Sequence, residues 1–170
     1  MSILTQARVR ELFDYDPSRG TLTRLSARGN RAAGSSAGTP NWSGHLYVEI
    51  DRRTYAVHRV VWLYLYGAWP SSQIDHINGK RDDNCIANLR LATPSENQCN
   101  SKRRSDNKSG LKGVCFRKDN GRWAAQITFD GQQRHLGLFA TREEAYAARL
   151  AAVEKFHGEF AAHRCRPAGA

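Results

Sequence analysis

Four polar residues between positions 74 and 100 have the types and spacing of a hydrolytic metal site: Asp75, His76, Asn88 and Asn97. A carboxylate and an amide oxygen are hard ligands that suit Mg²⁺ or Mn²⁺. A neutral imidazole can take a proton from an attacking water, and a nearby Asn oxygen can orient the ring. These groups together could hydrolyse a phosphodiester bond, with the metal stabilising the charge that develops on oxygen.

Two short strands and a helix would have to position these side chains. The Asn78-Gly79 turn allows residues 74–77 and 89–92 to pair as a ribbon, and a short helix can start around Pro94. This arrangement places the Asp-His pair on the first strand and Asn97 on the facing helix. Neighbouring strand residues point to opposite sides, so a local twist would be needed to bring both near one phosphate.

These residues resemble the HNH endonucleases, specifically the ββα-metal type found in phage and intron-encoded homing enzymes. The resemblance covers about residues 56–100 and includes His58-Arg59-Val60-Val61-Trp62 and IDHINGKRDDNCIANLRLATPSENQCN. It implies that Asp75 and Asn97 are metal ligands, that His76 is the general base, and that Asn88 positions the His76 ring. Many members have His at the position of Asn97, and the neutral amide favours magnesium over zinc.

The residues before this stretch predict an N-terminal lead-in that contains both helices and strands. Helices are expected at 4–13 and 58–66, and strands at 21–25, 45–50 and 53–57. Residues 14–20 have the composition of a turn. The Gly-, Ala- and Ser-rich stretch 28–39 is either a mobile loop, which we favour, or an arm that contacts DNA through Arg28 and Arg31.

A second unit is predicted after the polar, basic linker 101–110. Strands are expected at 113–117, 122–129 and 133–139. A capping box formed by Thr141 and Glu144 begins a helix that runs to Gly158. No catalytic cluster is evident in this unit.

The second unit is similar to the DNA-binding domain of plant ethylene-response factors, through Gly113-Val114, 121–127, 136–139 and 141–145. In that family the exposed face of a three-stranded sheet lies in the major groove. The resemblance and the basic linker together imply DNA contacts from Arg103, Arg104, Lys112, Arg117, Arg122, Trp123, Gln126, Thr128 and Arg134. Trp123 is as compatible with the core as with the groove, and the basic residues could instead form a solvated face. Several typical arginines are replaced, with Cys115 at one such place, so the plant target sequence does not transfer.

Composition agrees with a nucleic-acid partner. The chain has 26 Lys and Arg against 16 Asp and Glu, a net charge of +10, which favours polyanions, either nucleic acid or an anionic membrane surface. No apolar run reaches the roughly 18 residues of a membrane span. The first residues lack a signal-peptide core, so a cytoplasmic protein is expected. The four cysteines form no CxxC pair, which argues against a zinc ribbon and a disulfide framework.

The sequence therefore predicts an α+β protein with five regions. They are a lead-in (1–70), a ββα-metal core (71–100), a linker (101–110), a three-stranded sheet packed on one helix (111–163) and a tail (164–170). The predicted function is a Mg²⁺- or Mn²⁺-dependent endonuclease acting on double-stranded DNA in a phage-infected or prophage-bearing bacterium. It would need no small-molecule cofactor and, with one site per chain, would nick as a monomer or cut both strands as a dimer. The alternative is a non-catalytic, sequence-specific DNA-binding regulator, and an RNA-directed protein is a third, weaker alternative.

Overall fold

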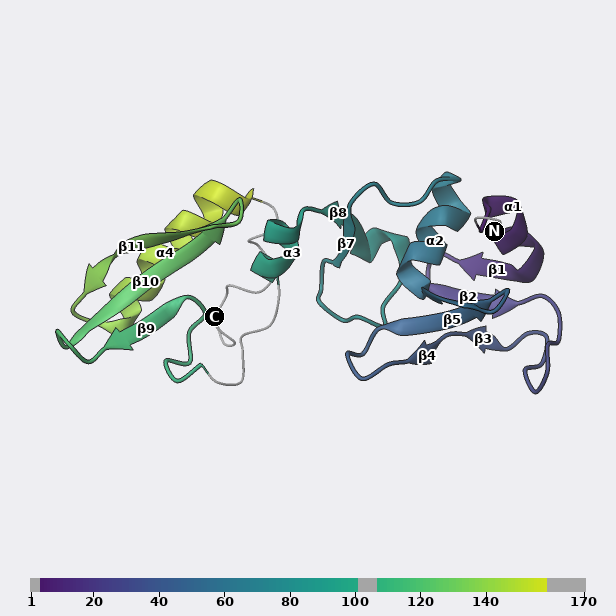
Figure 1. The fold of residues 1–170 in the computed structure, drawn as a ribbon, viewed down its shortest axis with the longest axis horizontal. Coiled ribbons are helices and arrows are strands. Elements are labelled where there is room, and N and C mark those ends of the chain that lie inside the picture. Colours follow the sequence, from purple (N-terminus) through teal and green to yellow (C-terminus); the bar gives the residue numbers. More distant parts are fainter. Residues whose placement is uncertain (1–3, 101–106, 159–170) are drawn as a thin grey trace. The chain divides into compact units, whose positions relative to one another are not determined.

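The fold is described for residues 4–100 and 107–158 in a computed structural model (Figure 1). Contacts divide the chain into two compact units, Met1–Ala92 and Thr93–Ala170. This division falls before the helix that carries Asn97. Within the described ranges no helix has both the length and the apolar character to cross a bilayer.

The first unit consists of short antiparallel sheets around two helices. In chain order its elements are α1 (Gln6–Leu12), β1 (Phe13–Asp16), β2 (Thr21–Arg24), β3 (Ser36–Ala37), β4 (Thr39–Pro40), β5 (Leu46–Ile50), β6 (Arg53–Ala56), α2 (Val57–Tyr66), β7 (Gln73–His76), the 3-10 turn η1 (Ile86–Asn88) and β8 (Leu89–Ala92). The strands form the sheets β1-β2-β3, β4-β5-β6 and β7-β8.

Helix α2 supplies much of the core of this unit. Its Val57, Val60 and Val61 are almost fully buried, and the helix packs against α1, β5 and β6. It ends at Gly67, whose φ of 74° is the left-handed conformation that closes many helices. The predicted helix at 58–66 and its glycine stop are confirmed.

The strand predictions in this unit are largely confirmed, but the stretch 28–39 predicted as a loop contains β3 and the first residue of β4, which pair with β2 and β5. Asp51 and Arg52 both have positive φ, 48° and 64°, as a tight two-residue hairpin between β5 and β6 requires. The prediction of a turn throughout 14–20 is wrong, because β1 extends to Asp16 and pairs with β2. Phe13 and Tyr15 alternate into the core, so burial outweighs the turn-forming composition.

The second unit contains α3 (Pro94–Asn100), β9 (Val114–Arg117), β10 (Arg122–Phe129), β11 (Gln132–Phe139) and α4 (Arg142–His157). Its sheet has the order β11-β10-β9, and α4 packs along one face, as Figure 1 shows. The Thr141 hydroxyl accepts a hydrogen bond from the Glu144 amide, and the Glu144 carboxylate accepts one from the Thr141 amide. The predicted three strands, helix and capping box are confirmed.

Candidate functional site

The β7-β8 ribbon carries the Asp-His pair in a buried position. Asp75 lies opposite Arg90 in the antiparallel register, and His76 lies opposite Leu89. Both Asp75 and His76 are 4% exposed. The predicted pairing is confirmed, but Asn78-Gly79 is only the first turn of a longer connection that also contains η1.

The His76 ring is held by Asn84. Its Nε2 lies 3.2 Å from Asn84 Oδ1, and the Asn84 amide nitrogen donates to the Asp82 carbonyl at 3.2 Å. Because an amide oxygen only accepts, the His76–Asn84 bond requires the proton on Nε2 and makes Nδ1 the basic nitrogen. Burial lowers the pKa of His76, and the bond to Asn84 and the charge of Asp75 oppose this shift only in part. The ring is therefore neutral near pH 7, as a general base must be.

Asn88 has a different position from the one expected. Its side-chain oxygen accepts from the Asn78 amide at 2.9 Å, and its amide donates to the Asp83 carbonyl at 2.8 Å. Its backbone carbonyl accepts from Ile77 at 2.9 Å. Both polar atoms of the side chain are thus engaged by the backbone of the loop, so Asn88 fixes the chain that follows His76 and does not contact its ring.

Asp75 forms an ion pair with Arg90 across the ribbon. Arg90 Nε and Nη2 donate to Asp75 Oδ2 at 3.0 and 2.9 Å. Both bonds end on one oxygen, and an ionised carboxylate can accept about four hydrogen bonds or metal contacts in all. The pair therefore orients the Asp75 carboxylate within the ribbon.

Distant parts of the first unit stabilise the loop that holds His76. Tyr15 Oη donates to the Asn84 carbonyl at 2.9 Å, and Arg81 Nη1 donates to the Ser43 carbonyl at 2.9 Å. Gly20 has φ +66°, and a Cβ there would clash with the backbone of Asn84 and Cys85. The predicted lead-in is thus part of the structure that positions the site.

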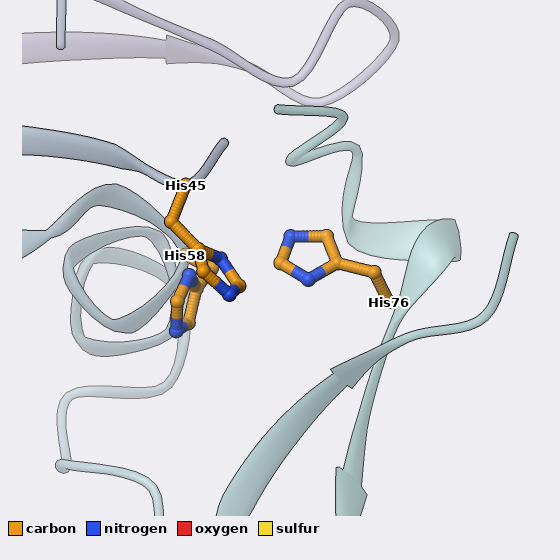
Figure 2. A group of neighbouring side chains, drawn as sticks. All are labelled: His45, His58 and His76. Carbon is orange, nitrogen blue, oxygen red and sulfur yellow. The ribbon is translucent and has the colours of Figure 1, made fainter. Parts of the chain in front are cut away.

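Two further histidines lie beside His76 and were not singled out from the sequence. The ring centroids of His45 and His58 are 5.4 and 5.2 Å from that of His76, and 5.1 Å from each other. In Figure 2 the three rings point toward one another. Burial lowers the pKa of His45 to about 4 and of His58 to about 3, so both rings are neutral near pH 7.

Asn97, the other predicted ligand, lies half-buried on α3 in the second unit. Thr93 directly precedes the helix and exchanges hydrogen bonds with Glu96: the Glu96 amide donates to Thr93 Oγ1, and the Thr93 amide donates to Glu96 Oε2. The predicted helix around Pro94 is confirmed. The role of Asn97 as a ligand stays a prediction.

The sheet of the second unit separates the predicted DNA contacts into two groups. Ala125 and Ile127 of β10 belong to the clusters formed with α4. Alternation therefore places Gln126 and Thr128 on the opposite face, called the open face because α4 does not cover it. Arg122 shares that face by the same alternation, and so does its cross-strand neighbour Arg117.

Arg134 lies on a different face of the sheet from the predicted contacts Gln126 and Thr128 on β10. It lies opposite Ile127, on the face that α4 covers, and its guanidinium is 5.8 Å from the Phe129 ring and 5.3 Å from the Phe156 ring. Trp123 packs against the cluster formed with α4, which favours its core alternative. Lys112 is half-exposed, and Arg103 and Arg104 lie outside the described residues.

Comparisons with known proteins place this site in a family. Residues 55–99 match the family model described as HNH endonuclease. The chain is 36% identical over 110 residues to Protein 3.8 of Escherichia phage T7, an alignment that covers 63% of this chain and 88% of that protein. It is 32% identical over 117 residues to an uncharacterized HNH endonuclease of Acanthamoeba polyphaga mimivirus, covering 68% of this chain and 60% of that protein. No solved structure matches.

The matched segment contains the whole β7-β8 ribbon and all four residues that the sequence singled out, Asp75, His76, Asn88 and Asn97. One family assignment follows from the β7-β8 ribbon, the buried neutral imidazole of His76 and the alignment with the phage protein. The chain belongs to the HNH endonuclease family and is a nuclease of that family.

Proposed function

We propose that the chain is a Mg²⁺-dependent endonuclease that nicks double-stranded DNA, with His76 as the general base. The observation that carries this proposal is the His76 ring, buried, neutral and held by Asn84 next to Asp75. An imidazole in this state can accept a proton at neutral pH without first having to lose one. The phage relative supports a bacterial host cell as the setting.

Asp75 and Asn97 would hold the divalent metal that HNH nucleases use. Asp75 fits this role, because Arg90 orients its carboxylate and the carboxylate offers oxygen donors of the class that Mg²⁺ prefers. The role of Asn97 is supported by its position inside the segment that matches the family. When bound, the metal would polarise the scissile phosphate and stabilise the leaving oxygen.

The chain's own residues would carry the proton transfer. Asn84 keeps the proton of His76 on Nε2, so Nδ1 accepts the proton of the attacking water. Asn88 fixes the backbone after His76, and Arg90 fixes the carboxylate of Asp75. The base and the ligand are therefore oriented before substrate binds, which lowers the cost of reaching the transition state.

We further propose that the second unit binds DNA through the open face of its sheet. Arg117 and Arg122 are exposed there, beside the half-exposed Gln126 and Thr128. Arginine can pair with guanine or phosphate, and glutamine can pair with adenine. A tethered module of this kind raises the local concentration of the nuclease at its target.

Plasmid cleavage tests the proposal. The full chain with Mg²⁺ should convert supercoiled plasmid to the open circle, a chelator should stop the reaction, and His76→Ala should slow it by about 10²–10⁴-fold. Glu49→Ala, an exposed change on β5, is the matched control and should cleave like the wild type. A plasmid that stays supercoiled with Mg²⁺ and Mn²⁺ would contradict the enzyme, and a linear first product would contradict nicking.

A further inference from the structure

His45, His58 and His76 bring three imidazole rings together from three separate parts of the first unit. His45 precedes β5, His58 lies in the first turn of α2, and His76 ends β7. One ring nitrogen from each residue lies within 4.8 Å of the others. Figure 2 shows the His76 ring facing the rings of His45 and His58.

Two ring nitrogens in this group of histidines are buried without a hydrogen-bond partner in the described part of the chain. His45 Nδ1 and His58 Nδ1 form no hydrogen bond within the described part of the chain, and His58 is only 9% exposed. A buried polar atom that lacks a partner is unfavourable, because it has lost its hydrogen bonds to water. A ligand that accepts their lone pairs would remove this cost, and a cation does so directly.

The donor set selects the class of ion. Three neutral imidazoles suit Zn²⁺ and its neighbours in the transition series, whereas Mg²⁺ prefers the oxygen atoms of groups such as Asp75. Three nitrogens about 2.0–2.1 Å from one tetrahedral zinc stand about 3.4 Å apart. The separations within 4.8 Å therefore require only small movements of the rings.

We propose that His45, His58 and His76 form a binding site for a zinc-class ion, and that its occupancy inhibits DNA cleavage. His76 cannot both hold the ion and accept the proton of water with the same lone pair. The inhibitory half rests on the proposed role of His76 as the general base, whereas the binding half does not. The chain would then have an oxygen site for the activating metal and a nitrogen site for an inhibitory one.

Binding is tested on the full chain without DNA, with Co²⁺ as a spectroscopic substitute for Zn²⁺. We expect one Co²⁺ per chain with visible bands typical of nitrogen and oxygen ligands, which Zn²⁺ then displaces. X-ray absorption of the zinc-loaded wild type should show three imidazole ligands. Thiolate bands, or fewer than three imidazoles, would assign the ion elsewhere and overturn the proposal.

Variants locate the site. His45→Gln and His58→Gln should each weaken Zn²⁺ binding more than about tenfold, or about 1.4 kcal/mol. His135→Gln makes the same change on an exposed position of β11 and should bind like the wild type. Wild-type affinity in both cluster variants would overturn the proposal. If a variant does not fold, the absorption spectrum of the wild-type protein still decides the matter.

Cleavage tests the inhibitory half. One equivalent of Zn²⁺ added to the Mg²⁺ reaction should slow the wild type at least tenfold, and His45→Gln should lose most of that inhibition relative to its own zinc-free rate. Zinc that leaves the wild-type rate unchanged or raises it would overturn the inhibition. Failure of the endonuclease proposal shows separately, as a wild type that does not cleave in Mg²⁺ alone.

Discussion

The two units of this protein differ in the burial of their candidate functional residues. The first buries His58, Asp75, His76 and Asn84 to 9% exposure or less. The second buries small apolar residues of β10 against α4 and leaves arginines such as Arg117 and Arg122 exposed. The first arrangement favours chemistry, because burial sets protonation states and fixes orientation. The second favours contact with a polyanion, because exposed guanidinium groups reach phosphates and base edges.

The units also differ in how far along the chain their functional residues lie from one another. The open face of the second unit comes from strands joined by short turns. The environment of His76 comes from Tyr15, Gly20, His45 and Asn84, which are far apart in sequence. We therefore expect the first unit to be sensitive to changes remote from the site, and the second to respond locally.

The largest remote effect is expected for Gly20→Ala. The new Cβ would need positive φ and would clash with the backbone of Asn84 and Cys85, which costs about 2–5 kcal/mol. Urea unfolding and plasmid cleavage should both be impaired. Gly29→Ala is the control, since Gly29 has φ +58° but no atom within 4 Å of its Cβ position. Equal losses in the two variants would show that Gly20 does not support the site.

Asn84→Ala tests which asparagine orients the base. Loss of the contact between Asn84 and the His76 ring should lower the cleavage rate about 10–100-fold. Asn88→Ala should chiefly lower stability, by about 1–3 kcal/mol, because it leaves loop backbone groups unpaired. Cleavage rates measured alongside unfolding curves separate the effect on catalysis from the effect on stability. The reverse pattern would return the orienting role to Asn88.

Tyr15 connects the core of the first unit to the site in a pH-dependent way. Burial raises the pKa of Tyr15 to about 12, compared with about 10 in an unfolded chain. The unfolded state therefore loses the phenolic proton first, and stability should fall as pH rises from about 10 to about 12. Tyr15→Phe should lower stability at pH 7 by about 1 kcal/mol and flatten this alkaline loss. Unfolding curves of the wild type and of Tyr15→Phe at pH 9 and 11 measure this loss of stability. A similar alkaline loss in both proteins would contradict the prediction.

The smallest effects are expected in the second unit. Arg122→Ala should weaken DNA binding a fewfold and reduce the slope of log K against log salt by about 1 if the side chain contacts phosphate. Arg134→Ala should leave DNA binding nearly unchanged, because Arg134 lies over Phe129 and Phe156 on the covered face. Titrations at several salt concentrations compare the two. A larger loss with Arg134→Ala would show that the covered face binds DNA.

Much of the fold was predictable from local signals. Gly67 after an apolar run, the Asp51-Arg52 hairpin and the Thr141–Glu144 capping box each specify a conformation within a few residues. Local composition failed at β1, where pairing with β2 and the burial of Phe13 and Tyr15 outweigh a turn-forming sequence.

The residues of the site also divide into those predicted from the sequence and those that only the tertiary structure brings together. The sequence by itself determined the family and the Asp75-His76 pair, because residue type and spacing within one short motif specify that chemistry. Only the tertiary structure decided that Asn84 contacts the ring, that His45 and His58 lie beside it, and that Arg134 faces α4. The reason is physical: packing and strand register determine which side chains meet, and a shift of one residue in register reverses the face on which each side chain lies.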